Sequence, residues 1–124
     1  VILVGFSRGS IAVNALGLSS DEAAGLWKAS ICFSHYDGVH EWPFVGSDAA
    51  SALTRLQRLG NKPQFIISES PEQLAQTRAY LEKTGVKGNW TFATTGFINH
   101  DDRWALRPSP AREQVRQWLK QQCE

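Results

Sequence analysis

The sequence contains no methionine, only two cysteines and no excess of charge of either sign. Cys32 and Cys123 form no CxxC motif, and two cysteines are too few for a disulfide framework. Thirteen Lys and Arg face twelve Asp and Glu among the 124 residues, which gives a formal net charge of +1. A chain so close to neutrality lacks the basic surface that binds nucleic acid or an anionic membrane. We therefore expect no nucleic-acid partner.

Long apolar runs are missing as well. The longest covers residues 1–6 if Gly5 is counted, whereas about 18 consecutive apolar residues are needed to cross a bilayer. We therefore expect no membrane span. Hydrophobic residues make up 42% and charged residues 20% of the chain, which is typical of a globular domain rather than a disordered or fibrous protein. The length fits one domain or part of one.

The chain opens directly on an apolar segment, without Met at position 1 and without polar residues before it. Such an opening is typical of a cut chain, so we expect these residues to be a fragment of a longer protein. Any signal peptide would then lie upstream, and its absence here says nothing about localisation.

Apolar segments alternate with helix-length segments along the chain. Residues 1–4, 29–33, 64–68 and 90–94 are rich in β-branched or aromatic side chains and are predicted to be strands. Helical spacing and capping patterns predict helices that begin near residues 9, 19, 48, 70 and 109. Strands that are joined through helices favour a parallel sheet with helices on both faces. We predict the α/β class, as a three-layer α/β/α fold with a mostly parallel sheet.

Residues 5–9 read Gly-Phe-Ser-Arg-Gly and lie where the first predicted strand meets the first predicted helix. A sharp turn there would expose the Ser7 hydroxyl above the sheet, and flanking glycines would avoid clashes with the backbone. The backbone N–H of Arg8 would then lie where an oxyanion forms. The alternative is that Gly5 and Gly9 only ease an ordinary strand-to-helix turn.

Three further reactive side chains follow predicted strands. In open parallel sheets, ligands bind beyond the carboxyl ends of the strands. A serine nucleophile needs a base that a third group orients, and His100, after the last strand, is the candidate base. The acid remains open between Glu69 and Asp37. Glu69 could also be a favourable first-turn helix charge, and Asp37 with its following glycine forms a strong turn pair.

Several of these segments together resemble the C-terminal half of an α/β-hydrolase. They are VILVGFSRGS, the capped helix after it, the strands ASICF and QFIIS, and the NHDD loop before the final helix. The resemblance covers residues 1–124 and implies the C-terminal part of one catalytic domain, with its N-terminal strands outside this sequence. It implies Ser7 as nucleophile, then Glu69 or Asp37 as acid, then His100. Against the family pattern, a short Ser-Glu-Ser-Pro stands in place of a longer Gly-x-x-Asp segment.

Aromatic side chains lie near the predicted strand ends, where they could wall a substrate pocket or pack under a long loop. The candidates for substrate binding are Phe6, Tyr36, Trp42 and Trp104. The His, Asp and Glu residues show no zinc-type spacing, and residues 5–9 lack the Lys-Ser/Thr of a phosphate-binding loop. We expect no metal and no other cofactor.

The sequence therefore favours a serine hydrolase that cleaves a carboxylic ester through an acyl-enzyme, as an esterase or lipase does. Its partner would be a small-molecule or acylated substrate. Two alternatives stay open: a protein of the same fold that binds a ligand without catalysis, and a serine peptidase of the same fold. The choice between acyl and peptide substrates depends on residues 36–48 and on the segments outside this sequence.

Overall fold

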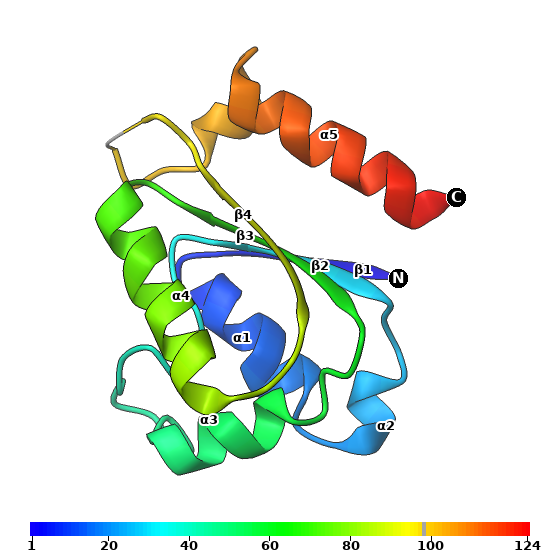
Figure 1. The fold of residues 1–124 in the computed structure, drawn as a ribbon, viewed down its shortest axis with the longest axis vertical. Coiled ribbons are helices and arrows are strands. Elements are labelled where there is room, and N and C mark those ends of the chain that lie inside the picture. Colours follow the sequence, from blue (N-terminus) through cyan, green and yellow to red (C-terminus); the bar gives the residue numbers. More distant parts are fainter. Residues whose placement is uncertain (98) are drawn as a thin grey trace.

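The computed structural model describes residues 1–97 and 99–124. Strands and helices alternate along this part of the chain (Figure 1). They are β1 (Ile2–Phe6), α1 (Arg8–Gly17), α2 (Asp21–Ala24), β2 (Ala29–Phe33), α3 (Ala49–Leu56), β3 (Pro63–Ser68), α4 (Pro71–Thr84), β4 (Asn89–Thr94), the short 3₁₀ helix η1 (Arg103–Ala105) and α5 (Pro110–Cys123).

The strands form one sheet in the order β1-β2-β3-β4, and each neighbouring pair is parallel. Parallel pairs require long crossover connections, which the helices supply. The carboxyl ends of all four strands therefore meet at the same edge of the sheet. Every residue of β2 is buried, as expected of a central parallel strand that is covered on both faces. The predicted α/β class with a parallel sheet is confirmed.

Two apolar clusters pack against opposite faces of the sheet, because successive strand side chains point to opposite sides. Cys32 of β2 belongs to the cluster with residues of α1, α3 and α4. Its neighbours Ile31 and Phe33 belong to the cluster with Val115 and Trp118 of α5. Figure 1 shows the same division, with α5 on one side of the sheet and α1, α3 and α4 on the other.

β2 has its predicted bounds, β3 and β4 each begin one residue earlier than predicted, and β1 begins one residue later and ends two residues later. β1 continues through Gly5 and Phe6, because both residues still pair with β2. The caps at Asp48, Ser70 and Ser109 accept hydrogen bonds from the amides three residues on, as the sequence patterns predict.

The cap of α2 differs from the prediction by one residue. The Ser20 hydroxyl, and not that of Ser19, accepts the hydrogen bond from the Ala23 amide, at 3.1 Å. Ser19 instead donates its hydroxyl to the carbonyl of Leu16 at the end of α1. The helix therefore begins at Asp21.

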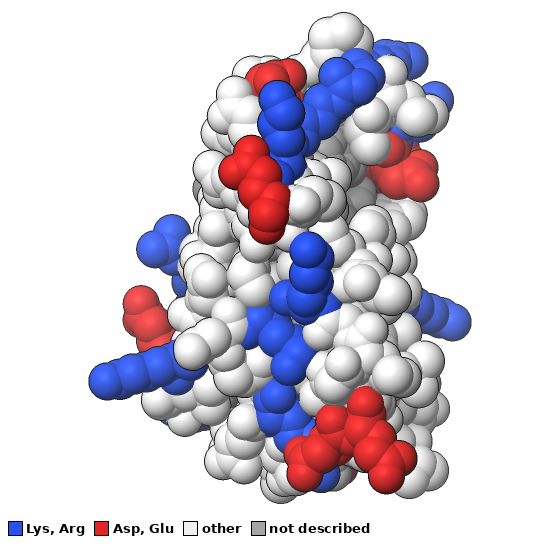
Figure 2. Space-filling model, turned by 90° about the vertical axis from the view of Figure 1, so that its right-hand side faces the viewer, with Lys and Arg blue, Asp and Glu red and all other residues white. Residues whose placement is uncertain are grey.

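Acidic and basic side chains are interspersed on the face in Figure 2, so neither sign of charge covers that face alone. This distribution agrees with the near-zero net charge of the chain. Within residues 1–97 and 99–124, no helix has both the length and the apolar character needed to cross a bilayer.

Candidate active site

Ser7 occupies a strained turn between β1 and α1. Its φ of 58° lies in a region that residues other than glycine rarely adopt. Three backbone hydrogen bonds hold it there. Its N–H donates to the carbonyl of Phe33 at 3.0 Å, and its own carbonyl accepts from the amides of Ser10 at 3.0 Å and Ile11 at 3.4 Å. Strained residues cluster at functional sites, where the surrounding structure maintains them. The turn thus holds Ser7 at the carboxyl edge of the sheet.

The two glycines beside Ser7 have different roles. A Cβ atom on Gly5 would lie 2.2 Å from the carbonyl oxygen of Gly9 and 2.7 Å from the amide nitrogen of Ser10. Gly5 is therefore required by the close approach of β1 and α1. A Cβ on Gly9 would meet no described atom within 4 Å. The sequence-based explanation that glycines avoid clashes holds for Gly5 and not for Gly9.

His100 links Ser7 to Glu69, although the three residues are far apart in the sequence. Its Nε2 lies 3.1 Å from the Ser7 Oγ, and its Nδ1 lies 3.0 Å from the Glu69 Oε1. The ring of Phe6 lies beside the imidazole, with ring centres 5.0 Å apart. Because the His100 side chain is 52% exposed, these few contacts determine the orientation of the ring.

Glu69 directly follows β3, and its carboxylate is largely buried, with 7% of the side chain exposed. A buried carboxylate requires a hydrogen-bond partner, and the imidazole of His100 supplies one. If Nδ1 carries the proton that this contact requires, Nε2 is left with a free electron pair facing the Ser7 hydroxyl. The arrangement can then remove a proton from that hydroxyl.

Asp37, the other candidate acid, has a different partner. Its two carboxylate oxygens accept hydrogen bonds from the Arg55 guanidinium of α3, at 2.8 and 3.0 Å. This bidentate contact raises the pKa of Arg55. Arg55 also donates to the carbonyl of Gly46 at 2.8 Å. The pair thus ties the loop after β2 to α3, and the structure does not bring Asp37 into contact with His100.

Two residues directly after β2 lie at the site although the sequence analysis did not select them. Ser34 has a φ of 86° and an Oγ that lies 3.1 Å from the His100 Nδ1. The ring of His35 lies 5.8 Å from that of His100, measured between ring centres. Burial, and then the neighbouring imidazole of His100, lower the pKa of His35. The available signal was their position after a buried strand, the same signal that selected Glu69.

The four aromatic candidates lie in different environments. Phe6 stacks on Phe33 and also contacts the His100 ring. Tyr36 is buried in the core, where its hydroxyl donates to the Gln64 Oε1 at 2.6 Å. Trp104 is buried in the cluster beneath α5. Trp42 lies at a cavity beside α1. Of the two alternatives that the sequence left open, Tyr36 and Trp104 therefore follow the one in which the side chain packs in the interior.

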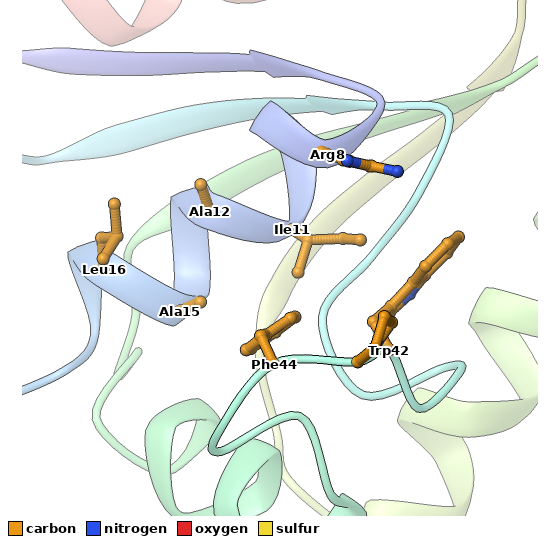
Figure 3. A pocket seen from close by; sticks show the side chains of 8 residues that line it. Arg8, Ile11, Ala12, Ala15, Leu16, Trp42 and Phe44 are labelled. Carbon is orange, nitrogen blue, oxygen red and sulfur yellow. The ribbon is translucent and has the colours of Figure 1, made fainter.

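The cavity beside Trp42 has a volume of about 370 Å³. Figure 3 shows it between α1 on one side and the loop around Trp42 and Phe44 on the other, with Arg8 at the end where the helix begins. Its lining is mostly apolar and consists of Arg8, Ile11, Ala12, Ala15, Leu16, Trp42, Pro43 and Phe44. Because Arg8 follows Ser7 directly, the cavity begins beside the strained turn.

The backbone N–H of Arg8 is the candidate oxyanion donor. Arg8 is the first residue of α1, so its amide has no acceptor within the helix. The positive end of the helix dipole lies at the same point. This amide can therefore donate to a negatively charged oxygen that forms beside Ser7.

The residues that the structure describes hold no group of three or more His, Cys, Asp and Glu side chains that could bind a metal ion. No protein-family model, no curated protein and no solved structure matches this chain.

Proposed function

We propose that this chain carries the catalytic residues of a serine hydrolase of the α/β-hydrolase type, which cleaves a carboxylic ester. One observation supports the proposal above all: the contacts run without interruption from the Ser7 Oγ through the two nitrogens of His100 to the Glu69 carboxylate. In this proposal Ser7 is the nucleophile, His100 the base and Glu69 the acid.

The reaction proceeds in two halves. The Ser7 oxygen attacks the ester carbonyl, and the His100 Nε2 accepts the hydroxyl proton. The tetrahedral intermediate then collapses, the bond to the alcohol breaks, and Nε2 returns the proton to the leaving oxygen. A water molecule attacks the resulting acyl-serine with His100 again as base, which releases the carboxylic acid and restores Ser7. Throughout, the Glu69 carboxylate accepts the hydrogen bond from the Nδ1–H of His100 and stabilises the transient imidazolium.

The negative oxygen of each tetrahedral intermediate requires hydrogen-bond donors at a preorganised position. The Arg8 amide at the start of α1 supplies one of them in this proposal. We further propose that residues 1–124 are the C-terminal part of a single catalytic domain, and that the second donor belongs to its N-terminal part.

The cavity beside α1 supports an ester with an apolar group. Its volume of about 370 Å³ lies within the range of small-molecule sites, which are typically concave and mostly apolar. Apart from the Trp42 indole and the Arg8 guanidinium at one end, the side chains that line the cavity carry no hydrogen-bonding group. We therefore favour an acyl or aryl ester over a peptide as the substrate.

Covalent labelling tests the proposal directly. A fluorophosphonate probe should modify Ser7 in the folded full-length protein and leave Ser7→Ala unlabelled, and peptide mass spectrometry should locate the adduct. The matched control Ser19→Ala removes an exposed hydroxyl and should be labelled like the unaltered chain. A folded protein in which Ser7 remains unmodified would contradict the proposal and would favour a binding protein without catalysis.

A further inference from the structure

Ser34 combines burial, a strained backbone and a contact with the candidate base. It directly follows β2 and is buried, and its N–H donates to the carbonyl of Ile67 in β3 at 2.8 Å. Its φ of 86° is unfavourable for any residue with a Cβ atom and is easily adopted by glycine. Relative to glycine, Ser34 therefore adds a conformational cost and a hydroxyl group.

That hydroxyl reaches the same nitrogen as Glu69 does. The Ser34 Oγ lies 3.1 Å from the His100 Nδ1, and the Glu69 Oε1 lies 3.0 Å from it. When Nδ1 carries its proton, both oxygens act as acceptors for a single N–H. The two acceptors come from the ends of neighbouring strands, β2 and β3, so together they restrict the imidazole more than either would alone.

We propose that Ser34 is a positioning residue that acts through His100. This inference rests on the serine-hydrolase function proposed above. The Ser34 oxygen holds the ring so that Nε2 faces Ser7, and it accepts a share of the Nδ1 hydrogen bond when the imidazole becomes positively charged. Because that charge appears only as the Ser7 proton is transferred, the contact contributes to the chemical step rather than to substrate binding.

Two substitutions separate the hydroxyl from the backbone. Ser34→Gly removes the hydroxyl and relieves the positive φ, whereas Ser34→Ala removes the hydroxyl and keeps the strain. Ser30→Ala is the matched control, because it also removes a buried serine hydroxyl. Ser30 lies within β2 near its amino end, away from the carboxyl edge of the sheet. Each variant of the full-length protein is assayed with p-nitrophenyl butyrate for kcat and KM, and its melting temperature is measured.

We expect Ser34→Gly and Ser34→Ala to lower kcat by about tenfold to a hundredfold with little change in KM. The loss of a hydrogen bond to a charged group typically has an effect of this size. Ser34→Gly should melt at or above the temperature of the unaltered chain, and Ser30→Ala should keep its kcat. If Ser34→Gly loses activity but is as stable as the unaltered chain, the hydroxyl acts in catalysis and not in maintaining the fold.

A Ser34→Gly variant with unaltered kcat, in a protein whose Ser7 reacts with the fluorophosphonate probe, would overturn the role of Ser34 alone. Should Ser34→Gly not fold, an unaltered kcat in Ser34→Ala would have the same meaning. If Ser7 in the unaltered chain fails to react with the probe, the hydrolase proposal falls and the role of Ser34 falls with it.

Discussion

Glu69 and His100 are separated by 31 positions in the sequence, yet the Glu69 Oε1 lies 3.0 Å from the His100 Nδ1. β3 ends next to Glu69, and β4 pairs with β3 in parallel through Thr94. The parallel register therefore brings the loop after β4, which carries His100, to the end of β3. The contact depends on how the strands pair and not on any local motif.

Replacing Glu69 by Gln should separate catalysis from folding. The variant keeps the size of the side chain but removes the charge that stabilises the imidazolium and selects its tautomer, so hydrolysis should fall by about 10³- to 10⁴-fold. The melting temperature should change little. Steady-state hydrolysis of p-nitrophenyl butyrate and thermal unfolding measure the two effects, and a Gln variant with nearly full activity would exclude Glu69 as the acid.

Asp37→Ala, in contrast to Glu69→Gln, should lower stability and leave activity nearly unchanged. It leaves the Arg55 guanidinium without its carboxylate partner in a largely buried position, where such a loss typically costs about 3–5 kcal/mol of unfolding free energy. Chemical denaturation should show this loss, while the rate per folded molecule stays within a few-fold of the original. The double variant Asp37→Ala/Arg55→Ala should be less destabilised than the sum of the two single variants. Strict additivity would show that the pair does not act as a unit.

Gly5 and Gly9 should respond differently to alanine. Gly5→Ala places a methyl group against the backbone of α1 and should cost at least about 3 kcal/mol, with loss of the Ser7 turn. Gly9→Ala adds a methyl group in open space within a helix and should stabilise the protein by up to about 1 kcal/mol. Urea denaturation of both variants measures the difference. Equal destabilisation by the two substitutions would show that β1 and α1 do not approach each other as described.

His35 should make stability depend on pH. Burial lowers the pKa of His35 in the folded chain below its ordinary value of 6.5. At pH values between the lowered pKa and 6.5, the unfolded chain therefore binds more protons at this residue than the folded chain does. Stability should therefore fall as the pH drops below about 6.5 and level off below the lowered pKa. In His35→Gln, this component of the pH dependence of the melting temperature should disappear. An unchanged profile would mean that His35 titrates alike in both states.

Local chemistry was enough to predict much of the fold. The segments rich in β-branched or aromatic residues predicted all four strands, because such side chains favour strands. Burial on both faces holds for β2, whose residues are all buried, whereas the edge strands β1 and β4 are partly exposed. Asp48, Ser70 and Ser109 predicted helix starts, since each side chain satisfies a free amide at a helix N-terminus. At α2, two adjacent serines could both cap the helix, and pattern alone chose the wrong one, because the choice depends on how the chain leaves α1.

The sequence by itself determined the α/β class, the sharp turn at Ser7 and the reactive side chains at the strand ends, because these depend on residue types and on neighbours along the chain. Tertiary structure alone decided which carboxylate meets His100. Asp37 lies within reach of Arg55 from α3, whereas Glu69 faces the imidazole across the sheet edge. Strand register and helix packing determine these distances, and neither can be deduced from spacing along the chain. The same holds for Ser34, whose strained backbone and contact with His100 become visible only once β2 and β3 are paired.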